Sequence, residues 1–107
     1  EKDIVLTHPT LVSQVVGNFH IIPSDVISII REHHERPDGT GFPRGMNANM
    51  ISPLSSIFIV ASEVADYLVR SNFTMDCSIE LIEYLKENFS IGRFEKIIEA
   101  TEKGILE

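Results

Sequence analysis

Residues 33 to 45 read HHERPDGTGFPRG, and the rest of the chain is interpreted outward from this stretch. Two adjacent histidines, His33 and His34, end a run of apolar residues at helical spacing, and a loop rich in glycine and proline follows at once. Glycine permits positive φ and close backbone approach, whereas proline keeps a loop stiff. Metal-capable side chains at a helix end, followed by a stiff loop with one arginine, are what a phosphate-handling site requires.

The helix that carries these histidines is expected over residues 24–36. Val26, Ile27 and Ile30 precede the pair at helical spacings, so the apolar stripe is wide enough for both imidazoles to face a buried site. The loop over residues 37–53 is long for a compact domain, and such loops are usually functional or disordered. Its glycines and prolines favour an ordered functional loop. An irregular connection between two helices is the alternative.

The same stretch resembles the HHE–DG–GYP–G motif of the HD-GYP family, bacterial metal-dependent phosphodiesterases that hydrolyse cyclic di-GMP. The likeness extends to THPTL upstream, and downstream to ISPLSSIFIVASEVADYL and SIGRFEKIIEA. It covers nearly the whole chain but corresponds only to the later part of the family's domain. The resemblance implies one all-α domain over residues 1–107, an HD-superfamily-like bundle of about five helices with a long Gly/Pro loop, lacking the N-terminal helix that bears the His-Asp pair.

Length and composition fit one small globular domain. The chain has 107 residues, 43% of them hydrophobic, which is enough for a single core. A formal net charge of −7 argues against a nucleic-acid polymer as partner, and an anionic substrate would then need a metal to hold it. A single cysteine, Cys77, excludes an internal disulfide and suits a reducing, cytoplasmic setting.

The sequence shows no sign of a targeting or membrane segment. No run approaches the roughly 20 apolar residues of a membrane span, and the N-terminus lacks the layout of a signal peptide. The chain starts at Glu1 without a methionine, which suggests a processed or excised fragment.

The first predicted helix, residues 4–19, carries a further histidine. His8 shares one stripe with Leu11 or Val12, Val15 and Phe19. The histidine is therefore expected on the face that meets the core. Alone, a histidine on an apolar face is usually only packed. The resemblance implies a metal ligand instead, because HD-GYP domains place a metal-binding histidine in an HP motif at this distance before HH.

The third predicted helix, residues 54–70, starts after Pro53 and is apolar on two sides. One stripe comprises Leu54, Ile57, Phe58, Ala61, Val64, Ala65 and Leu68, and the opposite side comprises Ile59, Val60 and Tyr67 with Glu63 between them. A carboxylate among apolar neighbours needs a partner, because an unpaired buried charge is costly. A metal, a salt bridge to Lys or Arg, or a position at the rim that reaches water all remain open for Glu63. The resemblance implies a metal ligand, since the family has a ligating aspartate here; Asp66 matches a second aspartate that is not expected to bind metal.

Two further helices are expected over residues 77–88 and 91–103. Their predicted boundaries are Asp76 or Ser78 and Ser90 as caps, and Gly104 as a stop. Their apolar faces are expected to be core.

The candidate metal ligands are His8, His33, His34 and Glu63. Neutral imidazoles with a carboxylate suit Fe, Mn or Zn. The resemblance implies Fe or Mn, in a binuclear centre if an upstream segment supplies the bridging aspartate. In such a centre the ions lie about 3.5–4 Å apart, generate hydroxide from a bridging water and neutralise phosphodiester charge.

Substrate contacts are expected from the loop, because guanidinium groups and glycine-rich backbones both bind phosphate. The residues are Gly39, Gly41, Pro43 and Arg44. A solvated surface charge is the alternative for Arg44. The implied ligand is a cyclic dinucleotide.

The catalytic residues stay unknown, because no His-Asp dipeptide occurs in the chain. Phe42 replaces the tyrosine of GYP, and Ile57 stands where an arginine is usual in the family. Three interpretations follow. The chain is the later part of a cyclic di-GMP phosphodiesterase; or it is a catalytically inactive signalling or interaction module, joined to a receiver or sensor domain or to a second copy of itself; or it is a helical domain that binds nothing.

Overall fold

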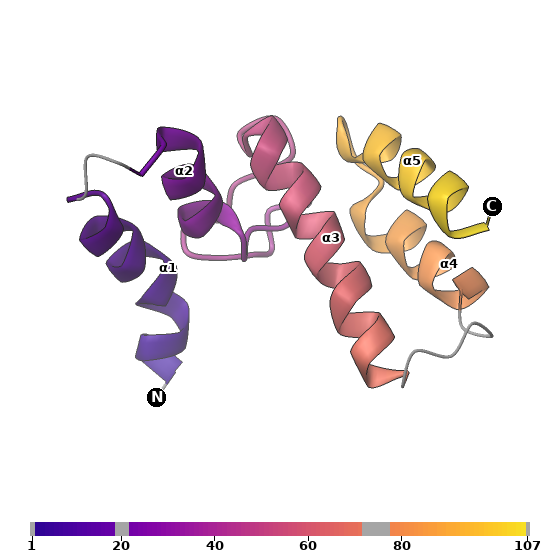
Figure 1. Ribbon diagram of the computed structural model, residues 1–107, viewed down its shortest axis with the longest axis horizontal. Coiled ribbons are helices and arrows are strands. Elements are labelled where there is room, and N and C mark those ends of the chain that lie inside the picture. Colours follow the sequence, from indigo (N-terminus) through magenta and orange to yellow (C-terminus); the bar gives the residue numbers. More distant parts are fainter. Residues whose placement is uncertain (1, 19–21, 72–77, 107) are drawn as a thin grey trace.

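The computed structural model describes residues 2–18, 22–71 and 78–106, which form five α-helices and no β-strand (Figure 1). The helices are α1 (Lys2–Val16), α2 (Ser24–Glu32), α3 (Pro53–Arg70), α4 (Ser78–Phe89) and α5 (Phe94–Leu106). The predicted all-α class is confirmed. The molecule is elongated, with α1 and α2 at one end, α4 and α5 at the other and α3 between them (Figure 1). No helix in these residues has both the length and the apolarity to cross a membrane.

Two helix ends differ from the prediction in ways that matter. Helix α2 ends at Glu32, because the backbone turns there and the Glu35 N–H donates to the Glu32 carbonyl at 2.8 Å. The two histidines therefore begin the loop instead of ending the helix. Helix α5 does not stop at Gly104 but continues to Leu106, since glycine only weakens a helix interior and does not forbid it.

The other predicted boundaries are close to those observed. Helix α3 begins at Pro53, and the Ser52 hydroxyl caps it by accepting from the Ser55 N–H at 3.4 Å. Helix α5 begins at Phe94, so Ser90 is not its cap. The predicted residues Phe19, Asp76 and Cys77 lie outside the described residues.

The hydrophobic core lies in the half formed by α3, α4, α5 and the end of the long loop. Its fully buried apolar residues are Ala48, Ile51, Ile59, Val60, Leu81, Leu85, Phe89, Phe94 and Ile98. Of the described helices, α1 packs on α2 and on no other, and α2 connects it to α3. The core therefore holds one end of the molecule together, and α1 is attached through α2.

Over the first two turns of α3, only one of its two apolar sides meets the core. Ile57 is 52% and Phe58 44% exposed, whereas Ile59, Val60 and Glu63 are buried against the core. When a helix is apolar on two sides, its periodicity does not reveal which side meets the core. Helices α4 and α5 pack on α3, and the side that carries Ile59 and Val60 is the buried one. In α1 the expected core stripe is likewise exposed, with Val15 at 62%, and the buried side chains there are Pro9 and Ser13.

The loop after α2 is built around the buried carboxylate of Glu35. Its two oxygens accept hydrogen bonds from the Arg44 and Met46 backbone N–H groups, each at 2.9 Å. These bonds draw the second arm of the loop against the first, and the Ala48 N–H donates to the Pro37 carbonyl at 2.9 Å. The carboxylate thus replaces a regular ladder of backbone hydrogen bonds, and the loop is ordered, as predicted.

Gly41 is indispensable to this arrangement. A Cβ atom there would lie 2.4 Å from the His34 carbonyl oxygen and 2.5 Å from the Arg36 nitrogen. No side chain fits so close to backbone atoms. The glycine therefore allows the loop to fold back on the segment that carries the histidines, where the Phe42 N–H donates to the His34 carbonyl at 3.1 Å.

Candidate metal centre

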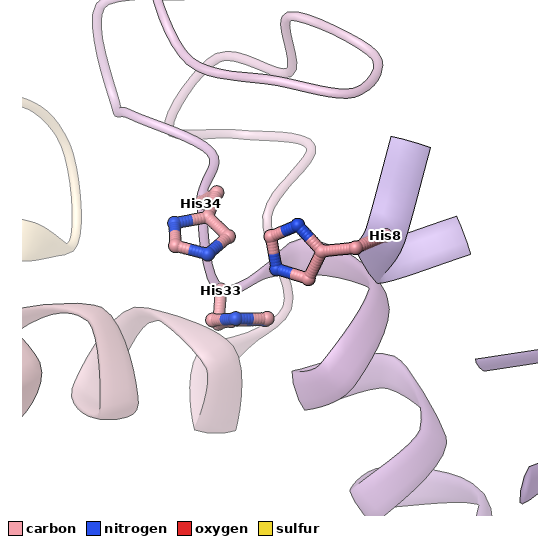
Figure 2. A group of neighbouring side chains, drawn as sticks. All are labelled: His8, His33 and His34. Atoms are coloured by element: carbon pink, nitrogen blue, oxygen red, sulfur yellow. The ribbon is translucent and has the colours of Figure 1, made fainter. Parts of the chain in front are cut away.

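Three histidines from two parts of the chain meet at one point (Figure 2). His8 comes from α1, whereas His33 and His34 follow directly after α2. Each histidine has one ring nitrogen in the group, and these three nitrogens all lie within 4.8 Å of one another. All three side chains are partly buried. Figure 2 shows the rings turned toward one another. Nitrogens so placed can bind one divalent cation.

The ring of His33 is oriented by the helix that precedes it. Its Nδ1 lies 2.7 Å from the Ile30 carbonyl oxygen. A carbonyl only accepts hydrogen bonds, so Nδ1 carries the proton and the lone pair is on Nε2. Metal-binding histidines are commonly held in this way, because the bond fixes both the tautomer and the plane of the ring.

The ring of His34 is held by stacking. It lies parallel to Phe42, with ring centroids 4.8 Å apart and an interplanar angle of 13°. Burial lowers the pKa of His34 from its usual 6.5 to about 4, and the charges of His33, His8 and Arg36 act in the same direction, against the Asp66 carboxylate. The imidazole is therefore neutral at pH 7, the form that binds metal.

Glu63, the fourth predicted ligand, does not join the histidine group. Its Oε1 forms a salt bridge with Arg36 Nη2 at 2.9 Å, and its Oε2 accepts a hydrogen bond from the Tyr84 hydroxyl at 3.3 Å. Of the partners that the sequence left open, the structure shows the salt bridge. Three of the four predicted ligands are thus together, whereas the fourth, on α3, contacts Arg36 of the loop and Tyr84 of α4.

The loop residues predicted to bind substrate have several roles in the structure. The N–H of Gly39 donates to the Arg36 carbonyl at 2.9 Å and that of Thr40 to the Asp38 carboxylate at 3.0 Å. These two N–H groups are therefore used within the loop, and the phosphate contact expected of the backbone around Gly39 to Gly41 stays a prediction. Gly41 is required for packing, as described above.

Pro43 and Arg44 lie in the same loop. The Phe42–Pro43 peptide bond is cis, and Pro43 is partly buried. Arg44 is exposed, and among the described residues its guanidinium forms no salt bridge. The guanidinium of Arg44 is therefore accessible to a phosphate, and its role as a substrate contact stays a prediction.

Sequence reasoning gave no role to two residues on which the site depends. Glu35 organises the loop, and Arg36 binds the carboxylate of Glu63. A signal for Glu35 was present: a carboxylate placed before a dense run of glycine and proline meets many backbone N–H groups that lack regular partners. No such local signal pairs Arg36 with a residue 27 positions away.

Comparison with known proteins adds the family. The family model of the HD domain matches residues 1–87. The chain belongs to the HD domain family. No curated protein and no solved structure matches it significantly. Membership of this family indicates, in general, a metal-dependent phosphohydrolase that binds divalent metal. The histidine group fits such a metal, because three imidazoles converge, His34 is neutral and the His33 ring is held in a fixed orientation.

Proposed function

We propose that this HD domain is a metal-dependent phosphodiesterase that hydrolyses a cyclic dinucleotide, cyclic di-GMP being the substrate that the HHERPDGTGFPRG stretch indicates. The observation that carries the proposal is the convergence of His8, His33 and His34 beside that stretch. The two halves of the motif thus come together: the metal-capable side chains and the loop that follows them.

The three histidines would hold the cation. When bound, a divalent metal supplies a hydroxide at neutral pH and neutralises charge on the phosphodiester. The chain's own task is to orient the imidazoles and to keep that of His34 neutral. The Ile30 carbonyl orients the His33 ring, and the Phe42 ring stacks on His34, whose pKa burial lowers to about 4.

The surroundings of the histidines suit a nucleotide. The Phe58 ring lies 6.2 Å from that of His33 and is 44% exposed, which offers an aromatic face on which a base can stack. Arg44 presents an exposed guanidinium on the same loop as His34, and guanidinium groups bind phosphate through paired hydrogen bonds. An aromatic face and a cation near a metal are the chemistry that recognises a phosphodiester with a base attached.

The proposal is tested by incubating the native gene product, loaded in turn with Fe²⁺, Mn²⁺ and Zn²⁺, with cyclic di-GMP and following the linear dinucleotide. We expect the wild type to hydrolyse cyclic di-GMP and His33→Ala to do so at least about 100-fold more slowly. Losing even an outer-shell partner of a metal ligand commonly lowers metal affinity or activity by about 10–100-fold. Glu83→Gln, which removes an exposed carboxylate of α4, is the control and should keep full activity. Equal turnover in wild type and His33→Ala would refute the proposal.

The second candidate is an inactive signalling module that binds the same ligand without hydrolysing it. It is favoured by one observation: the chain contains no His-Asp dipeptide. In the same assay this module would retain cyclic di-GMP on the metal-loaded protein, measured by equilibrium dialysis, while no linear product forms.

A further inference from the structure

The carboxylate of Glu63 is fully engaged by groups other than a metal. Arg36 binds one oxygen at 2.9 Å and the Tyr84 hydroxyl donates to the other at 3.3 Å. Glu63 itself is only 7% exposed. A carboxylate in this state becomes a metal ligand only by leaving the partly buried Arg36 guanidinium without its partner.

Arg36 is fixed as firmly as the carboxylate it binds. Its guanidinium lies over the Phe89 ring, 5.3 Å from the centroid, and Nη1 donates to the Glu35 carbonyl at 3.4 Å. Phe89 is 1% exposed and belongs to the core. Separating the pair is unfavourable, because the Arg36 side chain is only 33% exposed and would lose its counter-ion. The pair is therefore anchored to the packed half of the molecule.

We propose that the Arg36–Glu63 pair keeps the carboxylate out of the metal centre, so that the described part of this chain holds one cation through three histidine nitrogens and without Glu63. The inference rests on the proposed function and sharpens it by naming the ligand set. It departs from the four-ligand set expected from the sequence, in which Glu63 completes the centre.

The ligand set determines which metals the site prefers. Imidazole suits Zn²⁺ and Fe²⁺, whereas Mn²⁺ favours oxygen ligands such as carboxylates. Three histidines with an open fourth position form a known type of catalytic zinc site. The single-ion centre of this chain should therefore bind Zn²⁺ or Fe²⁺ much more tightly than Mn²⁺.

The test is a competition titration of Zn²⁺ and of Mn²⁺ against a chromophoric chelator, in wild type, Glu63→Gln, His33→Ala and the control Glu83→Gln. We expect one Zn²⁺ per chain in the wild type. In Glu63→Gln the Zn²⁺ affinity should stay within about 3-fold of the wild-type value, because the changed side chain is not a ligand; the amide oxygen can still accept from Arg36, and the amide NH₂ can donate to the Tyr84 oxygen. The Zn²⁺ affinity of His33→Ala should be at least about 10-fold weaker than that of the wild type.

A measurement on the wild type makes the test independent of how Glu63→Gln folds. The carboxylate ¹³C resonance of Glu63 should not shift when Zn²⁺ is added, while the ring resonances of His8, His33 and His34 should shift or broaden. A shift of the Glu63 resonance overturns the inference. So does a 10-fold or larger weakening in Glu63→Gln, a second bound ion, tighter binding of Mn²⁺ than of Zn²⁺, or a wild type that binds no metal.

These outcomes separate this inference from the proposed function. A protein that binds one Zn²⁺ through its histidines but releases no linear dinucleotide supports the three-histidine centre and refutes the hydrolase. A protein that hydrolyses cyclic di-GMP but loses its metal in Glu63→Gln supports the hydrolase and refutes the three-histidine centre.

Discussion

The two ends of this molecule are stabilised by different means. The half formed by α3, α4 and α5 encloses a core of buried apolar side chains. Among the residues described in α1 and α2, only Pro9 is both apolar and fully buried, and the loop that follows them is organised by the carboxylate of Glu35. The three histidines lie in the second half. The difference teaches that the packed end provides most of the stability. The end that carries the histidines depends on polar contacts and on the cation that the histidines are proposed to bind.

The largest contrast between the halves should appear in stability. Phe89→Ala removes a ring that is 1% exposed, contacts Tyr84 and supports Arg36. We expect it to lower the free energy of unfolding by about 3–5 kcal/mol, the usual cost of such a truncation. Val15→Ser, on the exposed side of α1, should change it by no more than about 0.5 kcal/mol. Urea unfolding followed by circular dichroism measures both, and similar effects at the two sites would contradict the contrast.

Two glycines sharpen the comparison further. Gly41→Ala would place a Cβ 2.4 Å from the His34 carbonyl, so the loop must move; we expect a loss of about 1–3 kcal/mol, typical of overpacking, together with weaker metal binding. In Gly104→Ala, the new Cβ in α5 would have no atom within 4 Å. Because alanine has the higher helix propensity, this substitution should raise the free energy of unfolding by up to about 1 kcal/mol. The same unfolding experiment gives both values. A Gly41→Ala protein of unchanged stability and metal affinity would show that the loop is not held as described.

The smallest expected effect is the pH dependence contributed by His34. Its pKa in the folded chain is about 4, below the usual 6.5, so between these values the unfolded chain binds more protons than the folded one. The metal-free protein should therefore become more stable as pH rises from about 4 to 6.5, and His34 should add nothing further above that window. The effect is modest because the ring is partly exposed to solvent.

An NMR titration of the metal-free protein checks this directly. The His34 ring should titrate well below the ordinary histidine range. A midpoint near 6.5 would mean that the His34 ring is less buried than the structure places it.

The sequence predicted the class of fold, and three of the four residues that it named as candidate ligands lie together in the structure, for reasons that are local. A histidine pair before a Gly/Pro loop and a histidine in an HP motif are short patterns, and the structure brings their side chains together. What failed depended on partners distant in the chain. Glu63 was expected at the metal, but an arginine on the loop binds it.

The orientation of helices was equally hard to predict. Both sides of α3 are apolar, so only the packing of α4 and α5 decides that Ile59 is buried and Ile57 is exposed. The exposed stripe of α1 has the same origin, since α1 packs on α2 alone. Periodicity identifies an apolar face but does not identify its partner.

The central claim is that His8 on α1 shares one cation with the histidines that follow α2. Elemental analysis of the protein after saturation with Zn²⁺ and removal of excess metal tests it most directly, in wild type and His8→Ala. The account predicts one zinc ion per chain in the wild type and almost none in His8→Ala. A wild-type protein that retains no zinc, or a His8→Ala protein that retains as much as the wild type, would contradict it.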